Sequence, residues 1–481
     1  MNDWTSIVGL VAVAAPASVT LLLALLLLLG VRISETLIHR LMQIGTVVGL
    51  VSLLALFIGL ISTGRVEQLV NLGNWVTIPP GYHFKLAFQF DRLSIPFAAL
   101  VFVLCGTVGA FASRYMHREG GFQRFFLLFS LFNTGMILSA VAGSVEVMFA
   151  GWEFVGLSSV LLIGFFQERA APVQNGFWVW VVYRTTDTAL LFAAILTHQL
   201  VGEGDFHHLL GGGAWPNEVA TVTSTQAFLV GSLLLVAAAG KSALLPFCGW
   251  LPRAMEGPTP SSAVFYGALS VHLGAFLLLR VSPLIAASPV LAVLVVLLGL
   301  GTSIFAGAVG RRQTDIKSVL SFASLTQVGL VVAEIGLGAW VPFFWYVALV
   351  HLLGHACLRT LQFVRAPSLL LDYRTVENAL GDHLPRPAVK NQGFALWLNR
   401  LALERGYLDA ALKQYFVRPV LNLFRVIHRY EEAWANWLNG TPKEEAPLSG
   451  EGLAGPSVAS RLRLPHSPEQ QPQQLSTKAP V

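Results

Sequence analysis

Long apolar runs dominate this chain of 481 residues and decide which solvent it folds in. A transmembrane helix needs about 20 consecutive, mostly apolar residues. Eleven such runs precede Arg365, near residues 6–30, 38–63, 92–113, 124–143, 145–167, 176–201, 225–249, 259–281, 283–308, 315–338 and 340–364. Only 12% of the residues are charged, against about 25% in soluble domains. The sequence therefore predicts an all-α integral membrane protein with about 11 or more transmembrane helices.

The charges in the loops predict how the chain is oriented. Cytoplasmic loops hold the excess of Lys and Arg. One set of alternate loops carries ten: Arg32, Arg40, Arg114, Arg118, Arg124, Arg169, Arg253, Arg311, Arg312 and Lys317. The other set carries four: Arg65, Lys85, Arg92 and Arg280. We expect the N-terminus outside and the C-terminus in the cytoplasm. The first run is too long and too poor in basic flanks for a signal peptide, so we expect it to be retained.

The character of the chain changes after Arg365. Residues 394–438 repeat apolar positions at helical spacing with charges between them, which indicates amphipathic helices. Such helices suit either the membrane surface or a docking face for a soluble partner. From Thr441 onward, Pro, Gln, Ser and Gly predominate, and we expect disorder.

Ionisable residues at membrane depth are the candidates for function. Each costs about 2.5 to 3.5 kcal/mol on insertion scales, which implies a partner or an ion pathway. The runs contain nine of them: Glu153, Arg184, Asp187, Lys241, Glu334, His272, His351, His355 and Arg359.

Some of these residues have a purely structural alternative. Arg184 and Asp187 are three apart on one helix face, so they could satisfy each other locally. Glu334 lies near the end of a run and is expected to be interfacial, and His272 could be a hydrogen-bonded packing residue. Glu153 and Lys241 have no local partner, so their alternative is a distant ion pair.

His351 and His355 are four apart and face the same side of one helix, and Arg359 continues that stripe. Two such His can ligate a metal, but a third ligand is needed and none is near in the sequence. A proton relay is the better interpretation, because imidazole offers one donor and one acceptor nitrogen. We therefore predict no metal and no other cofactor in this chain.

Pro246 predicts a helix break one turn after Lys241. An interior proline removes a backbone hydrogen bond, and the freed groups survive in a bilayer only where protein or water satisfies them. Burial favours a neutral lysine, whereas a nearby carboxylate favours a charged one. If Glu153 moves closer or farther, Lys241 would switch between holding and releasing a proton.

Six segments together resemble the antiporter-like proton-translocating subunits shared by respiratory complex I and Mrp-type sodium/proton antiporters. They are DRLSIPF (91–97), RYMHREGGFQRFF (114–126), GWEFVGLSSVLLIGFF (151–166), AAAGKSALLPFCGWLPRAMEGPTPSSA (237–263), RRQTDIKSVLSFASLTQVG (311–329) and HLLGHACLR (351–359). The resemblance implies two inverted five-helix repeats with broken helices around a hydrated polar axis.

The resemblance also implies a proton pathway through the candidates. Glu153 falls on the family's glutamate and Lys241 on its central lysine, with Arg184 and Asp187 on the adjoining polar pair. His351 and His355 fall on the relay histidines, and Arg359 falls where a lysine is common. Tyr266 stands where the family usually has a histidine, and His272 is six residues further on. The family's later broken helix with a second lysine is missing, so the second repeat is shortened.

These departures point to one branch. AMEGPTPSSAVFYGALSVHLGAFLLLR (254–280), HACLRTLQFVRAPSLL (355–370) and LNRLALERGYLDAAL (398–412) resemble the membrane subunit of Dab-type, or Mps-type, inorganic-carbon accumulation systems. That resemblance implies a bacterial inner-membrane subunit that conducts a cation, with a proton expected first and Na⁺ left open. Its expected partner is a large cytoplasmic zinc protein similar to β-carbonic anhydrases. The ion gradient would drive hydration of CO2 to bicarbonate on that partner, so the chain itself would not be an enzyme.

This interpretation divides the chain into N-terminal helices (1–90), a first antiporter-like repeat (91–281), a partial second repeat (282–365), amphipathic helices (366–440) and a disordered tail (441–481). Membrane lipids are the other expected partners, and nucleic acid is not expected. Two alternatives remain open: a proton-translocating subunit of a complex I-like or Mrp-like assembly, and a non-conducting membrane anchor.

Overall fold

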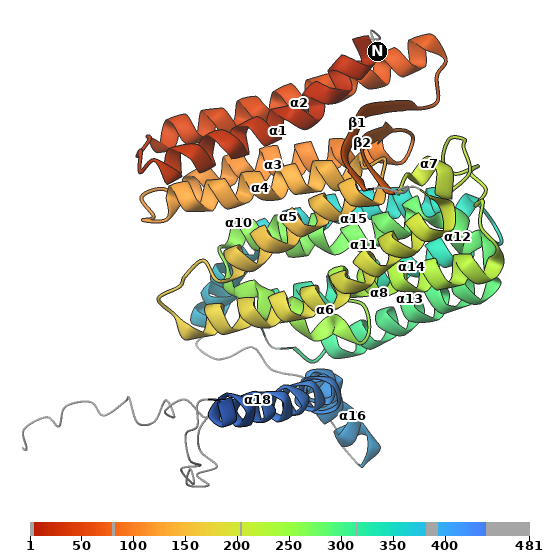
Figure 1. Cartoon of the computed structure of the whole chain (residues 1–481). Coiled ribbons are helices and arrows are strands. Elements are labelled where there is room, and N and C mark those ends of the chain that lie inside the picture. The colour runs from red at the N-terminus through yellow and green to blue at the C-terminus, as the bar shows by residue number, and fades with distance from the viewer. Residues whose placement is uncertain (1–3, 79–81, 203, 314, 381–392, 439–481) are drawn as a thin grey trace, which may run out of the picture. The chain divides into compact units, whose positions relative to one another are not determined.

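The computed structural model describes residues 4–78, 82–202, 204–313, 315–380 and 393–438, and these are mostly helical (Figure 1). Ten of the described helices are long and apolar enough to cross a membrane. They are α1 (Trp4–Leu28), α2 (Glu35–Thr63), α3 (Ser94–Tyr115), α5 (Val145–Ile163), α6 (Ala170–Val201), α8 (Ser224–Lys241), the helix over Thr259–Arg280, α13 (Pro289–Gly310), α14 (Ile316–Leu337) and the first part of α15 (Phe343–Leu380). The prediction of a multi-pass helical membrane protein is confirmed.

The eleventh predicted run, 124–143, also forms a helix, α4 (Phe122–Ala140), but it is not among these ten. Gln123 and Arg124 in its first turn and the buried Asn133 lower its mean hydropathy. The helix packs against α1, α3 and α5, so neighbouring protein surrounds much of its surface.

A β-hairpin, which the apolar runs do not predict, joins α2 to α3. Strand β1 (Gln68–Ile78) pairs antiparallel with β2 (Tyr82–Phe90), with Gln68 opposite Phe90. The alternation Phe84, Leu86, Phe88, Phe90 has the period of two that suits a strand. We call the side of the molecule with this hairpin the hairpin face. It also carries segments 204–223 and 281–288, which contain the short helices α7 (Phe206–Leu209) and α12 (Ser282–Ala287).

Two of the predicted spans are irregular. The run 225–249 is helical only to Lys241, and then continues as a 3₁₀ turn (Phe247–Gly249), α9 (Trp250–Arg253) and a second 3₁₀ turn (Ala254–Glu256). The run 259–281 is α10 (Thr259–Ser261), a π-helical stretch (Ser262–Leu269) and α11 (Ser270–Arg280). Every residue of its apolar window is buried, which places this helix at the centre of the protein.

Helices are also present in the predicted amphipathic region: α16 (Phe394–Leu403), a 3₁₀ turn (Arg405–Tyr407), α17 (Leu408–Leu412), a π-helical turn (Lys413–Val417) and α18 (Arg418–Leu438). The chain forms two compact units, Met1–Ala411 and Leu412–Val481. In the first unit, Arg253 of α9 donates to Asp409 at 2.7 Å, which ties the start of the tail to the broken helix. The predicted disordered tail, 441–481, lies outside the described residues.

Candidate functional site

Lys241 lies at the C-terminal end of α8 and is completely buried. Its Nζ donates to the Trp152 carbonyl at 3.0 Å. The ammonium also lies over two aromatic rings, 4.4 Å from the centroid of Tyr183 and 4.9 Å from that of Trp152. Rings in this position attract a cation electrostatically. A Cβ on Gly156 would come within 3.0 Å of Nζ, so the glycine leaves room for the lysine head.

Asp187 is the carboxylate nearest to this ammonium. Its Oδ2 is 4.0 Å from Lys241 Nζ, and its side chain is 2% exposed. The Trp152 indole N–H donates to Oδ1 at 2.6 Å, and Arg184 donates to Oδ2 at 3.2 Å. Three donors or cations therefore converge on one buried carboxylate. These contacts offset part of the cost of burying the carboxylate.

Glu153 lies one step further from the lysine than the sequence predicted. Its Oε2 accepts a hydrogen bond from Arg184, and its Oε1 has no partner in the described part of the chain. The expectation that Lys241 is poised directly against Glu153 is therefore wrong in this structure, because Asp187 occupies that position. Arg184 bridges the two acids, so the order along the cluster is Glu153, Arg184, Asp187 and Lys241.

The helix break lies directly at this cluster. Lys241 is the last residue of α8, five residues before Pro246. The Trp250 indole N–H donates to the Gly240 carbonyl at 2.9 Å, and Leu245 N–H donates to Thr302 Oγ1 at 3.1 Å. Protein groups thus satisfy backbone atoms that the interrupted helix leaves free, as expected for a break inside a bilayer.

A second buried cluster joins α11 to α15. His272 Nδ1 lies against the Ala268 carbonyl, and its Nε2 is 3.0 Å from His355 Nδ1. His355 Nε2 is in turn 3.4 Å from an Arg359 N–H donor. A carbonyl can only accept and a guanidinium can only donate. These ends fix the direction of the chain: Arg359 donates to His355, His355 donates to His272, and His272 donates to the carbonyl.

His351, one turn before His355, has different partners. Its Nδ1 lies 3.0 Å from Glu334 and its Nε2 lies 3.0 Å from the Gln327 side-chain oxygen. Both ring nitrogens of His351 thus face a side-chain oxygen. Glu334, expected at the interface, is thus the ion-pair partner of a histidine. The helix geometry predicted for His351, His355 and Arg359 is confirmed, and no group of three metal-ligating side chains is found among the described residues.

Tyr266 is fully buried in the π-helical stretch, and its hydroxyl donates to the Ser159 carbonyl at 2.9 Å. The structure therefore brings His272, rather than Tyr266, into contact with the relay histidines. The sequence had left both Tyr266 and His272 open as members of the relay. The π-helical stretch shifts the register of the helix between the two residues.

Sequence reasoning also missed two buried pairs near the hairpin face. Arg280, assigned above to a loop, is fully buried and donates to Asp91 at 2.5 and 3.2 Å. Glu146 pairs with His198 at 2.5 Å. Asp91 and Arg280 are 189 residues apart in the chain, so no local pattern could have linked them.

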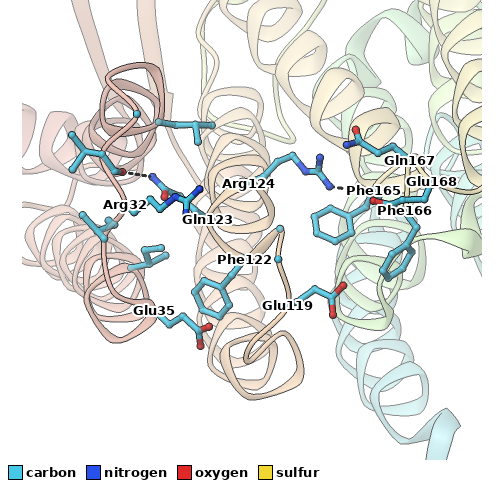
Figure 2. A pocket seen from close by; sticks show the side chains of 17 residues that line it. Arg32, Glu35, Glu119, Phe122, Gln123, Arg124, Phe165, Phe166, Gln167 and Glu168 are labelled. Atoms are coloured by element: carbon cyan, nitrogen blue, oxygen red, sulfur yellow. Dashed lines mark hydrogen bonds between the residues drawn. The ribbon is translucent and has the colours of Figure 1, made fainter.

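A cavity of about 950 Å³ opens on the face opposite the hairpin, among the loops 29–34, 119–121 and 165–168. Figure 2 shows its charged side chains, among them Arg32, Glu35, Glu119, Arg124 and Glu168. Arg124 donates to the Phe165 carbonyl at 2.9 Å across this cavity. None of its lining residues belongs to the Lys241 or histidine clusters.

Two family descriptions match the sequence. "NADH:quinone oxidoreductase/Mrp antiporter, TM" matches residues 142–381, and "NADH-Ubiquinone oxidoreductase (complex I), chain 5 N-terminus" matches residues 75–126. NADH-ubiquinone oxidoreductase chain 5 of Schizophyllum commune is 33% identical over 314 residues, which are 65% of this chain and 44% of that protein. The corresponding protein of Allomyces macrogynus is 34% identical over 302 residues, which are 63% and 45%. The chain thus spans less than half the length of these curated relatives.

Solved structures show the same fold. A chain of the Mrp complex from Dietzia sp. DQ12-45-1b aligns with a TM-score of 0.61 at 26% identity, over 79% of this chain and 38% of that one. A chain of the archaeal membrane-bound sulfane sulfur reductase aligns with a TM-score of 0.61 at 17% identity, over 82% and 77%; it supports the fold alone.

The fold and the buried ionisable clusters define a polytopic membrane protein with an antiporter-like architecture. The sequence matches add that residues 75–126 and 142–381 are similar to the antiporter-like membrane subunits of the complex I and Mrp type.

Proposed function

We propose that the chain conducts protons as one subunit of a multi-subunit membrane complex of the complex I or Mrp type. The observation that carries this proposal is the completely buried Lys241, which lies 4.0 Å from Asp187 at the end of an interrupted helix. A buried cation with an adjustable counter-charge can hold or release a proton as the two groups approach or separate.

The histidine cluster supports the same proposal. His272, His355 and Arg359 form a directed chain of hydrogen bonds between α11 and α15. Imidazole rings in such a chain can take up a proton on one nitrogen and release one from the other. The relay role of the predicted residues Glu153, Arg184, Asp187, Lys241, His272, His351, His355 and Arg359 stays part of this proposal.

The inorganic-carbon system is a second candidate, favoured by one observation. The segments 254–280, 355–370 and 398–412 resemble the membrane subunit of such systems, and Asp409 in the last of them accepts a hydrogen bond from Arg253 at the broken helix. The charged cavity in Figure 2 offers a surface on the expected cytoplasmic side.

The test is proton flux in proteoliposomes that contain the purified chain, driven by an imposed pH gradient. We expect Lys241→Ala to abolish the flux, and Lys317→Ala, a change of the same residue type at the half-buried start of α14, to leave it intact. A wild-type chain without flux above empty liposomes, alone or with its complex partners, would contradict the proposal.

A second arm separates the two candidates. Vesicles that also contain the zinc protein are supplied with CO2, and bicarbonate formation is followed with and without the gradient. Gradient-dependent bicarbonate formation that is lost in Lys241→Ala would establish the carbon-coupled function. Flux that is indifferent to CO2 and to the zinc protein would exclude it.

A further inference from the structure

The hairpin-face end of α11 holds a cluster of buried charges that the Lys241 and histidine clusters do not include. Arg280, the last residue of α11, is fully buried and binds both carboxylate oxygens of Asp91. Asp91 Oδ1 also accepts the backbone N–H groups of Leu93 and Ser94, at 3.0 and 2.8 Å. Burial alone would raise the pKa of Asp91, but the charge and hydrogen bonds of Arg280 outweigh it and lower the pKa. Asp91 and Arg280 therefore form a neutral, closed ion pair.

Two more carboxyl groups face the same arginine. Glu218 lies in the loop before α8 and is 8% exposed, and its Oε2 has no hydrogen-bond partner in the described part of the chain. Glu67 precedes β1, and Gln89 of β2 donates to its Oε2 at 3.5 Å. The cluster thus holds three carboxyl groups and one guanidinium that is already occupied by Asp91. With all three ionised, it would carry a net charge of about −2 in a buried site, which like-charge repulsion disfavours.

The loop that carries Glu218 is fixed to α11. Trp215 is completely buried, and its indole N–H donates to the Leu279 carbonyl at 3.0 Å. Asn217 N–H donates to the Ala214 carbonyl at 3.0 Å, which closes a turn immediately before Glu218. The loop is therefore held at the end of α11, and Glu218 is buried within it.

We propose that Glu218, with Glu67 beside it, is a proton-exchange site that passes protons between the solution at the hairpin face and the membrane interior. His272 lies on the same helix eight residues before Arg280, which corresponds to about 12 Å of helix rise. In each cycle a carboxylate oxygen of Glu218 binds one proton from water, and the same O–H bond breaks when the proton moves inward. The proposal rests on the proposed proton conduction, and it supplies an outer end for that pathway.

The electrostatics agree with this placement. Burial is the main cause that raises the pKa of Glu218 to about 7; Arg280 opposes this rise, and the charges of Asp91 and Glu67 contribute to it. Burial also raises the pKa of Glu67, while His207 of α7 and Arg280 oppose that shift. A carboxyl with these neighbours exchanges its proton near neutral pH.

The site is tested in the full chain in lipid nanodiscs by infrared difference spectroscopy during a pH titration. We expect a protonated-carboxyl band that disappears with a midpoint near pH 7, and that is absent from Glu218→Gln. Gln has the shape of a protonated Glu, so the variant should fold. The matched control is Glu256→Gln, which changes an exposed carboxyl on the opposite face and should retain the band.

Proton flux in proteoliposomes gives the second readout. We expect the flux in wild type to depend on pH with the same midpoint, and Glu218→Gln to lower it at least tenfold. A band that persists unchanged in Glu218→Gln overturns the site, whatever the flux shows. A band that is lost while the flux and its pH profile stay as in wild type overturns its role in exchange. Absence of wild-type flux overturns the proposed function instead, and the spectroscopic result still decides the site.

Discussion

Replacement of Asp187 by Asn tests which carboxylate is the counter-ion of Lys241. At 4.0 Å, two unit charges attract by about 4 kcal/mol at an effective dielectric constant of about 20. Both side chains are at most 2% exposed, so solvent screens the pair little. Asn keeps the shape of Asp187 and can still accept the Trp152 N–H. The substitution therefore removes the charge and leaves most of the packing.

If Lys241 loses about 4 kcal/mol of electrostatic attraction to Asp187, proton transfer that passes through the charged lysine would slow by up to about 10³-fold. We expect this loss of proton flux in proteoliposomes of Asp187→Asn. Glu153→Gln should have a smaller effect, because Arg184 holds Glu153 and the contact between Asp187 and Lys241 survives. Thr185→Ala is the matched control, since Thr185 lies on the exposed side of the same helix and its hydroxyl donates to the Val181 carbonyl.

Equal or greater loss of flux in Glu153→Gln than in Asp187→Asn would refute this reasoning. It would mean that Glu153, not Asp187, is the acid that meets the lysine while protons move. Loss of either variant from the membrane would show that the pair is structural.

Three further predictions concern packing and the relay. Asp91→Asn should lower the free energy of unfolding in mixed micelles by about 3 to 5 kcal/mol, because the buried Arg280 loses the carboxylate that binds it through two hydrogen bonds; a loss below about 1 kcal/mol would contradict the closed ion pair. Gly240→Ala should destabilise the protein by about 1 to 3 kcal/mol, because its Cβ would lie 2.0 Å from Thr186 Oγ1; an unchanged unfolding curve would show that α6 and α8 can separate freely. Tyr266→Phe should retain proton flux, because the hydroxyl is engaged with a backbone carbonyl; a loss as large as that of Lys241→Ala would place it in the relay.

Local patterns were sufficient for most of the architecture. The apolar runs predicted the spanning helices, because a bilayer of fixed thickness imposes their length. The spacing of His351, His355 and Arg359 placed them on one face, because a helix repeats every 3.6 residues. Pro246 and Lys241 marked the broken helix, although the helix ends at the lysine itself.

The sequence did not predict which partners these residues contact. Lys241 meets Asp187 rather than Glu153, and His272 rather than Tyr266 meets His355. These choices depend on the crossing of α5, α6 and α8 and on the register set by the π-helical stretch of residues 262–269. The helix crossing and the register each result from many side-chain contacts acting together.

Composition and helical period are local properties, so they were enough to predict a membrane protein and to identify the ionisable residues at membrane depth. Which of these residues form pairs depends on how the helices pack. Asp91 and Arg280 are 189 residues apart, Glu218 lies between them in the chain, and the three meet only because the helices pack. A charge in a low-dielectric interior needs a counter-charge. Packing decides where that partner lies, so the neighbouring sequence does not predict it.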